Sequence, residues 1–115
     1  MVCYEIWFDL KNSHKDLEFC DKVKGYLGLM RDRGNIDGYT LRRRMLGFGP
    51  PTLGEFNITI QLRDLKQLDD AFQLAASRGP EVEPVHAAVY GAVTNISFGL
   101  SRDFPDPVRV GSAGS

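Results

Sequence analysis

Two side chains in this sequence, His86 and Tyr39, have the chemistry of a proton-transfer pair. His86 lies in the apolar segment 81–93, and Tyr90 follows it one helical turn further along the chain. An imidazole beside an apolar cavity can act as an acid or a base near neutral pH. We therefore expect His86 to be a catalytic acid or base and Tyr39 to be a proton donor. The plainer alternative for His86 is a helix-surface histidine, or one that binds a backbone carbonyl.

Arg43 is the candidate anion-binding residue. It alternates with Tyr39, Leu41 and Met45, so a strand would point it toward the helices. A guanidinium in apolar surroundings must extend to solvent, pair with a carboxylate or bind an anion. A carboxylate from a helix is the plainer partner. The residues expected to bind a ligand are Arg43, Tyr4, Tyr90 and Phe48.

The segment "MLGFGPPTLGEF", residues 45–56, joins two predicted strands. A phosphate-binding loop precedes a helix and usually carries a lysine, and this segment has neither feature. It is also longer than a hairpin turn of about two to five residues requires, and Pro50 and Pro51 stiffen it. Phe48 is therefore expected either to overhang a ligand pocket or to extend the hairpin so that it grips a partner subunit.

Histidine and cysteine are too few and too scattered for a metal site of familiar spacing. The histidines are His14 and His86, the cysteines are Cys3 and Cys20, and no Cys-x-x-Cys or His-x-x-x-His pattern occurs. We predict no metal and no cofactor, with haem on either histidine an option by analogy alone. Cys3 and Cys20 are expected on opposite faces of one sheet, where they remain free thiols.

The composition is that of one soluble globular domain. The chain has 115 residues, of which 43% are hydrophobic and 25% charged, with a net charge of −1. This balance gives no attraction to nucleic acid, and no apolar run reaches the roughly 20 residues that span a membrane. Free thiols and the absence of a secretory signal predict a cytoplasmic protein. We expect one domain over residues 1–109 and a flexible, linker-like tail over 110–115.

Alternating apolar and polar residues predict four strands, at 2–10, 38–46, 55–63 and 93–102. A first helix is predicted to begin at a capping box formed by Ser13 and Asp16 and to end near Arg33, before Gly34. Its expected buried stripe is Leu17, Cys20, Val23, Leu27 and Met30. A second helix follows the capping box of Asp64 and Gln67. Its expected stripe is Leu65, Leu68, Phe72, Ala75 and Ala76.

A short further helix is predicted over residues 81–93, before the last strand. The order is thus β-α-β-β-α-β, which is the ferredoxin-like plan of the α+β class. Right-handed crossovers place both helices on one face of an antiparallel sheet. The side chains expected beneath the helices are Tyr4, Ile6, Phe8, Phe56, Ile58, Ile60, Ile96, Phe98 and Leu100.

The other face of the predicted sheet is polar and has three uses to weigh: exposure to water, RNA binding, or packing against a second sheet. RNA recognition on this fold requires stacked aromatic rings, and Trp7 is the only aromatic residue expected there. Acidic Glu5 and Asp9 stand against basic Arg42 and Arg44, so two copies can pair their charges. A water-covered sheet has no need of Trp7. We therefore predict a homodimer through this face, and no nucleic-acid or membrane partner.

Three segments carry a family resemblance: "YEIWFDLK", "GFGPPTLGEF" and "SRDFPDPVR" resemble a small uncharacterised bacterial family. Residues 1 to about 109 as a whole resemble the dimeric α/β-barrel superfamily, in which two ferredoxin-like sheets face each other. The resemblance implies the fold and the dimer. It does not imply one activity, because that superfamily includes cofactor-free oxygenases, cyclases, haem-degrading enzymes and proteins without known activity.

The predicted function is the binding of a small organic molecule, expected to be anionic, in a pocket between sheet and helices. As an enzyme, the protein would use cofactor-free acid–base chemistry of the cyclase, isomerase or monooxygenase kind. His86 and Tyr39 would move the proton and Arg43 would hold the anion. The alternative is a non-catalytic dimeric interaction protein with a filled core. A cavity on the order of a few hundred Å³ beside His86 would favour the first.

Overall fold

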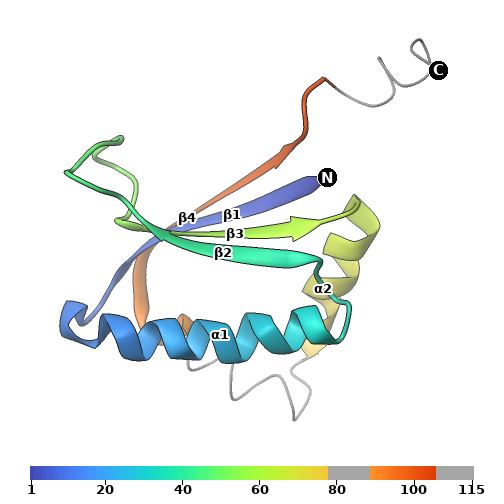
Figure 1. Ribbon diagram of the computed structural model, residues 1–115, viewed down its shortest axis with the longest axis horizontal. Helices are drawn as coiled ribbons and strands as arrows, with labels where there is room; N and C mark the ends of the chain where they lie inside the picture. Colours follow the sequence, from blue (N-terminus) through green and yellow to red (C-terminus); the bar gives the residue numbers. More distant parts are fainter. Residues whose placement is uncertain (78–88, 106–115) are drawn as a thin grey trace.

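The sheet and the helices follow one another as the alternating and helical patterns predict (Figure 1). A computed structural model describes residues 1–77 and 89–105. Its elements are β1 (Val2–Leu10), the 3₁₀ turn η1 (Ser13–Lys15), α1 (Asp16–Asp32), β2 (Gly38–Arg43), β3 (Phe56–Leu62), α2 (Leu65–Ser77) and β4 (Val93–Arg102). The predicted helix over 81–93 falls mostly outside the described residues.

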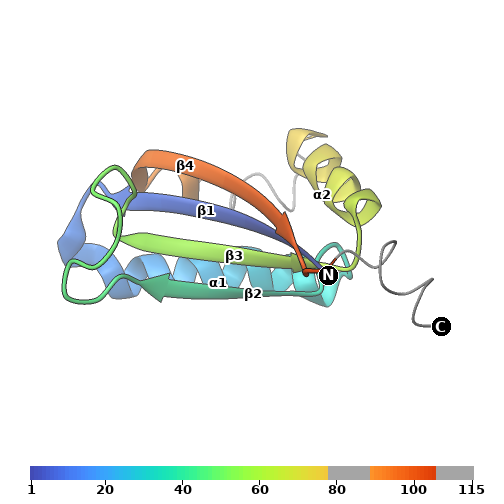
Figure 2. The same cartoon turned by 90° about the horizontal axis from the view of Figure 1, so that it is seen from above.

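The four strands form one antiparallel sheet in the order β2-β3-β1-β4. Ile6 of β1 lies opposite Ile58 of β3 and Phe98 of β4, so these three side chains share one face. Figures 1 and 2 show both helices on that same side of the sheet. The predicted ferredoxin-like α+β class is therefore confirmed.

The hydrophobic core lies between the sheet and the helices. Phe8 of β1 is almost fully buried and stacks on Phe56 of β3, with ring centroids 5.8 Å apart. Phe19 of α1 packs against the Phe8 ring from the helix side, with ring centroids 5.4 Å apart. Val23 of α1 and Leu62 of β3 have no exposed surface. The alternation of the strands thus fixes which side chains enter the core.

The first helix differs from its prediction in where it begins and in which side it buries. Ser13 lies within η1 and caps nothing, because Asn12 accepts the hydrogen bond from the backbone N–H of His14. Leu17, expected in the core, is 79% exposed. The buried side chains of α1 are Phe19, Val23, Tyr26, Leu27 and Met30. The stripe is therefore rotated toward Phe19 and Tyr26.

The end of α1 is as predicted. Gly34 has a positive φ of 77° and follows the last helical turn. Its N–H donates to the carbonyl of Arg31, and the N–H of Asn35 donates to the carbonyl of Met30. This pair of bonds is a Schellman motif, which requires the left-handed conformation that glycine adopts without strain.

Asp64 caps α2, as predicted, and the Gln67 side chain reaches back to the residue before the cap rather than to Asp64 itself. The N–H of Gln67 donates to Asp64 Oδ1 at 2.9 Å, and Gln67 Oε1 accepts from the N–H of Arg63 at 2.9 Å. Gln67 is buried, and its Nε2 also donates to the carbonyl of Gly34 at 3.1 Å. One side chain therefore joins the end of α1 to the start of α2. Of the predicted stripe, Leu68 is buried, whereas Leu65 and Phe72 are about half exposed.

The second strand is shorter than predicted, because it ends at Arg43 and not at residue 46. Leu46 has a positive φ of 56°, which a strand does not allow. Residues 44–55 instead form a loop that rises on the side of the sheet opposite the helices (Figure 1). Met45, expected on the helix-facing side, is exposed in this loop.

The last strand, β4, lies at the edge of the sheet, and its side chains are less buried than those of β1 and β3. Ile96, Phe98 and Leu100 were expected to pack beneath the helices. Phe98 and Leu100 do share the helix-facing side with Ile6 and Tyr4, but each remains 56% exposed. The start of the strand is irregular, since Asn95 has a φ of 52° and the pairing with β1 shifts between Trp7 and Asp9.

Two further predictions concern the cysteines and membrane-spanning helices. Cys3 of β1 and Cys20 of α1 are free thiols, as predicted. Over residues 1–77 and 89–105, the structure contains no helix with the length and apolar character needed to cross a membrane.

Candidate functional site

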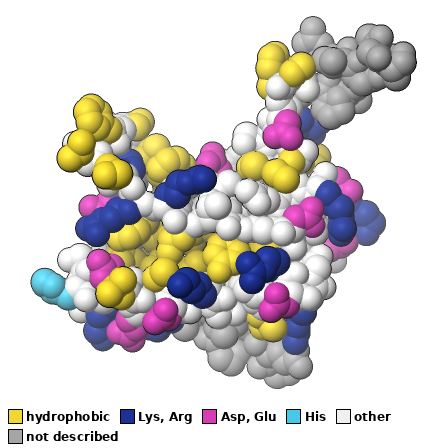
Figure 3. Space-filling view, in the orientation of Figure 1, with side chains coloured by type: hydrophobic (Ala, Val, Ile, Leu, Met, Phe, Trp, Pro, Cys, Tyr) yellow, Lys and Arg dark blue, Asp and Glu magenta, His cyan; other side chains and the backbone are white. Residues whose placement is uncertain are grey.

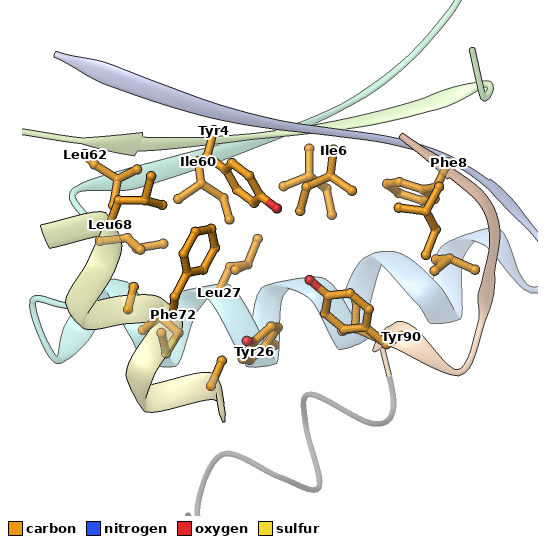
Figure 4. Close-up of a pocket in the computed structure, with 18 of the residues that line it drawn as sticks. Tyr4, Ile6, Phe8, Tyr26, Leu27, Ile60, Leu62, Leu68, Phe72 and Tyr90 are labelled. Carbon is orange, nitrogen blue, oxygen red and sulfur yellow. The ribbon is translucent and has the colours of Figure 1, made fainter. Parts of the chain in front are cut away.

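A cavity lies between the sheet and the helices, beside the core (Figure 4). Its free volume is about 80 Å³. Strand side chains form the upper wall and helix side chains form the lower wall in the view of Figure 4. The residues around it include Tyr4, Ile6, Phe8, Tyr26, Leu27, Ile58, Ile60, Leu68, Phe72, Val89, Tyr90 and Ile96. The described lining is apolar apart from three tyrosine hydroxyls.

These hydroxyls come from three different elements of the chain. Tyr4 belongs to β1, Tyr26 to α1, and Tyr90 to the segment that enters β4. In Figure 4 the hydroxyls of Tyr4 and Tyr90 point toward one another across the cavity. The side chains lie close enough for Tyr90 to raise the pKa of both Tyr4 and Tyr26. The cavity thus gathers polar groups that are far apart in the sequence.

The three phenols are protonated at neutral pH, and burial raises their pKa further above the ordinary value of 10.0. Loss of hydration raises the pKa of Tyr26 to about 12, with a smaller contribution from nearby Tyr90. Burial is also the main cause of the raised pKa of Tyr4, and the cause of the raised pKa of Tyr90. At neutral pH these groups are therefore hydrogen-bond donors and acceptors rather than bases.

Aromatic rings pack around Tyr4 beside the cavity. Phe72 of α2 meets the Tyr4 ring edge-on, with centroids 5.1 Å apart. Phe98 of β4 stacks on the same ring at 5.8 Å. Both phenylalanines are about half exposed, and of the two only Phe72 belongs to the described lining of the cavity.

The structure brings together two of the six predicted site residues. Tyr4 and Tyr90 line the cavity, whereas Tyr39, Arg43 and Phe48 do not belong to its described lining. Tyr39 packs at the edge of the core, with the Arg31 guanidinium 5.7 Å from its ring centre. Phe48 is exposed in the loop 44–55, away from the helix-facing side. His86 lies outside the described residues.

Arg43 lies on the helix-facing side, as expected, but at the far end of β2. Its guanidinium contacts Glu55 at 3.2 Å and Asp16 of α1 at 3.7 Å. It also covers the Phe56 ring, 5.3 Å from the centroid. This is the plainer arrangement weighed for Arg43, in which a carboxylate from a helix pairs with it. The expected pocket mouth at the loop 44–55 is not found, because this loop rises on the opposite side of the sheet.

Sequence reasoning missed Tyr26 and Phe72 as cavity residues. Tyr26 follows Phe19 by seven positions and precedes Met30 by four, which is a regular helical stripe. A stripe phased on Phe19 rather than on Leu17 would have found it. Phe72 was placed on the core side of its helix, and the structure shows it beside Tyr4 in the lining of the cavity.

Residues that could hold a metal do not gather in the described part of the chain. Over residues 1–77 and 89–105, no group of three or more His, Cys, Asp or Glu side chains has a suitable arrangement. His14 is exposed in η1, outside the cavity.

The open face of the sheet is a second candidate surface. Its centre is already buried within one chain, where Thr59 Oγ1 donates to Asn57 Oδ1 at 2.9 Å and lies 3.3 Å from Glu5 Oε1. Thr40 Oγ1 is buried there and has no hydrogen-bond partner in the described structure. Trp7 remains only half-buried on this face. Opposite Trp7 and Glu5, β4 presents the small residues Ser97 and Gly99.

Solved structures with this fold support the topology. A dimeric ferredoxin-like protein of unknown function from Jannaschia sp. CCS1 matches with a TM-score of 0.65 at 8% identity, covering 89% of this chain and 98% of its own. A dabb family protein with a ferredoxin-like fold from Mesorhizobium loti gives 0.65 at 13% identity, covering 90% and 96%. SnoaB, a cofactor-independent oxygenase from Streptomyces nogalater, gives 0.64 at 15% identity, covering 91% and 97%.

These matches confirm the resemblance to dimeric α/β-barrel proteins at the level of the fold. No curated protein matches the chain. A family model described as a family of unknown function, DUF6614, matches residues 1–114. The match extends over nearly the whole sequence, and the chain therefore belongs to the DUF6614 family.

Proposed function

We propose that this protein is a homodimer that binds a small, uncharged organic molecule in the cavity between sheet and helices. The observation that carries the proposal is the lining of the cavity, in which three tyrosines stand among apolar side chains and the hydroxyls of Tyr4 and Tyr90 point toward one another (Figure 4). Such a lining is typical of small-molecule sites, where a few polar groups orient a ligand held mainly by apolar contacts.

The ligand class follows from the charge of the walls. A charged group moved into an apolar cavity loses its hydration, and this loss is large unless an opposite charge meets it. Arg43, the cation expected to hold an anion, already contacts Glu55 and Asp16. The anionic ligand expected from the sequence therefore gives way to a neutral one that carries a hydroxyl or carbonyl group.

The size of the ligand is limited by the cavity. Its volume of about 80 Å³ is well below the roughly 300–1,000 Å³ of sites for drug-sized molecules. One small ring or short chain fits this room. A longer ligand would have to displace Phe72, the half-exposed ring of α2 in the lining.

Catalysis would add a proton transfer to this binding. SnoaB shares the fold and acts without a cofactor, which supports cofactor-free chemistry of the kind expected from the sequence. Tyr90 and Tyr4 would then donate protons in place of Tyr39. His86 remains the proposed base, and its replacement by alanine tests this part of the proposal through the loss of turnover with binding retained.

The dimer is proposed to form through the open face of the sheet. The Jannaschia protein with this fold is dimeric. The face carries acidic Glu5 on the inner strand β1 and basic Arg42 on the outer strand β2, so two copies offer each other opposite charges. A second sheet would also cover Trp7, which one chain leaves half-buried.

The binding test compares benzene, phenol and benzoate by NMR titration. Phenol should bind more tightly than benzene, because it can pair with a tyrosine hydroxyl, and benzoate should bind least. Tyr90→Phe should weaken the binding of phenol several-fold and leave benzene nearly unchanged. Arg43→Leu, the matched control outside the lining, should change neither. Preferred binding of benzoate would contradict the neutral-ligand proposal.

A second candidate function is a non-catalytic dimer without a ligand. The small volume of the cavity favours it, since a void of this size also occurs in cores that bind nothing. Binding of none of the three probes at millimolar concentration, with the dimer intact, would decide for this candidate.

A further inference from the structure

We propose that the loop 44–55 is a pre-ordered arm that buries its apolar tip on a second copy of this chain. The tip consists of Met45, Leu46 and Phe48. The inference rests on the proposed dimer and goes beyond it, because it assigns a part of the interface that lies outside the sheet.

The arm is held in shape by one arginine. Arg44 donates from Nη1 to the carbonyl of Pro50 at 3.1 Å and from Nη2 to the carbonyl of Leu53 at 3.0 Å. Gly49, with a φ of 136°, packs so closely on this side chain that a Cβ would collide with it. A guanidinium that joins two carbonyls in this way fixes the loop before any partner arrives.

The base of the arm is fixed to the sheet. The N–H of Glu55 donates to Asp9 Oδ1 at 2.8 Å, and Asp9 Oδ2 accepts from Asn95 Nδ2 at 3.0 Å. Gly54 lies directly against the backbone of Phe8, where any side chain would overlap the Phe8 carbonyl. The arm thus projects from a rigid point at the end of β1.

The tip presents large apolar side chains to solvent in spite of this order. Met45 is 75% exposed, Leu46 87% and Phe48 77%. Leu46 keeps a left-handed backbone with a φ of 56°, which is uncommon for a large side chain. Figure 3 shows these hydrophobic groups together at the end of the arm, with the surface hollowed between the arm and the end of β4. Clustered apolar side chains on a rigid projection indicate a contact with a partner.

The size of the open face argues that the partner is a second copy. A residue in a strand covers about 16 Å² of sheet. Strands of 9, 6, 7 and 10 residues therefore present a face of about 500 Å². A stable interface buries about 800 Å² on each partner. Two sheets facing each other need further contacts, and an arm that rises on the open-face side supplies them twice in a symmetric dimer.

The first experiment replaces the three tip residues by serine (Met45→Ser, Leu46→Ser and Phe48→Ser together). Sedimentation velocity should show the dissociation constant of the dimer raised by about tenfold or more. Leu17→Ser is the control, because Leu17 is equally exposed but lies on the helix side. It should leave the dissociation constant unchanged. Denaturation curves check that both variants remain folded.

The second experiment places a photoreactive benzophenone side chain at position 48 of the otherwise unchanged protein. Irradiation should join two copies covalently, and the same group at position 17 should not. If the serine variant leaves the dissociation constant unchanged and position 48 gives no cross-link, the proposed contact of the arm is wrong. The proposed dimer itself is then not contradicted. A wild-type chain that sediments as a monomer at high micromolar concentration overturns both. Binding of the tip to lipid vesicles with an unchanged dimer also overturns the arm.

Discussion

At the scale of single residues, the candidate site depends on tyrosine phenols that are neutral at physiological pH. The tyrosines reach the cavity from β1, from α1 and from the segment before β4, and most of the other lining residues are apolar. Neutral hydroxyls in such a place bind a ligand oxygen more strongly than in water, because the apolar surroundings screen the hydrogen bond less. The same burial makes the stability of the fold sensitive to alkaline pH.

Tyr26 gives a direct test of that burial. Its pKa is raised from 10.0 to about 12 in the folded protein. The folded state thus binds the proton more tightly than the unfolded state, and this contribution to stability is complete below pH 10 and is lost as the pH rises toward 12. Tyr26→Phe should flatten the fall of the unfolding free energy over that interval. It should also remove the most alkaline component of the tyrosinate absorbance titration; an unchanged titration would contradict the burial.

At the scale of elements, single side chains decide how neighbouring segments meet. Gln67 connects the start of α2 with the end of α1, and Gly54 lets the loop 44–55 pass over β1. Both contacts join segments that lie far apart in the sequence. Their replacement should therefore affect stability more than their small size would indicate.

Gly54→Ala should lower the free energy of unfolding by about 3 kcal/mol, because its methyl group would overlap the Phe8 backbone, which cannot move aside. Gly25→Ala is the matched control, since a methyl group at this exposed helical position meets nothing within 4 Å. It should raise stability by about 0.5–1 kcal/mol. Urea denaturation measures both changes, and equal effects of the two variants would refute the close approach.

Gln67→Ala should cost about 2–3 kcal/mol, because it leaves the N–H of Arg63 and the carbonyl of Gly34 without their partner. Gln73 lies on the same helix, and its amide contacts Asp69 at the surface. Gln73→Ala should therefore cost about 0.5 kcal/mol or less. Thermal unfolding of the two variants compares them, and a small effect at Gln67 would show that the connection between the helices is not needed.

At the scale of the whole molecule, no helix or strand among residues 1–77 and 89–105 covers the second face of the sheet. The helices cover the other face, and the loop 44–55 rises beside the uncovered one (Figure 1). Most of the polar side chains at its centre are already hydrogen-bonded within the chain. The charges toward its edges, rather than its centre, are thus the groups that can select a partner.

Arg42→Glu should weaken the proposed dimer by about tenfold or more, because it places a like charge where the partner's acidic residues approach. Lys24→Glu makes the same change of charge on the exposed side of α1 and should have no such effect. Light scattering over a dilution series measures both. Equal behaviour of the two variants would place the interface elsewhere.

Local patterns in the sequence determined the elements and their ends. The strict alternation of β1 and β3 gave both strands and the side chains that face the core. Asp64 with Gln67 gave the start of α2, and Gly34 gave the end of α1. These features depend on residues within a few positions of each other, so no other part of the chain has to be known.

Only the tertiary structure decided what those side chains meet. The alternation placed Arg43 on the correct side, but its carboxylates come from α1 and from the end of the loop 44–55. It placed Phe98 on the core side, but an edge strand receives too little cover to bury it. Tyr4, Tyr26 and Tyr90 are separated by more than twenty residues at each step and meet only because β1, α1 and the segment before β4 pack around one cavity. Periodicity fixes the direction of a side chain, whereas its partners depend on how distant elements pack.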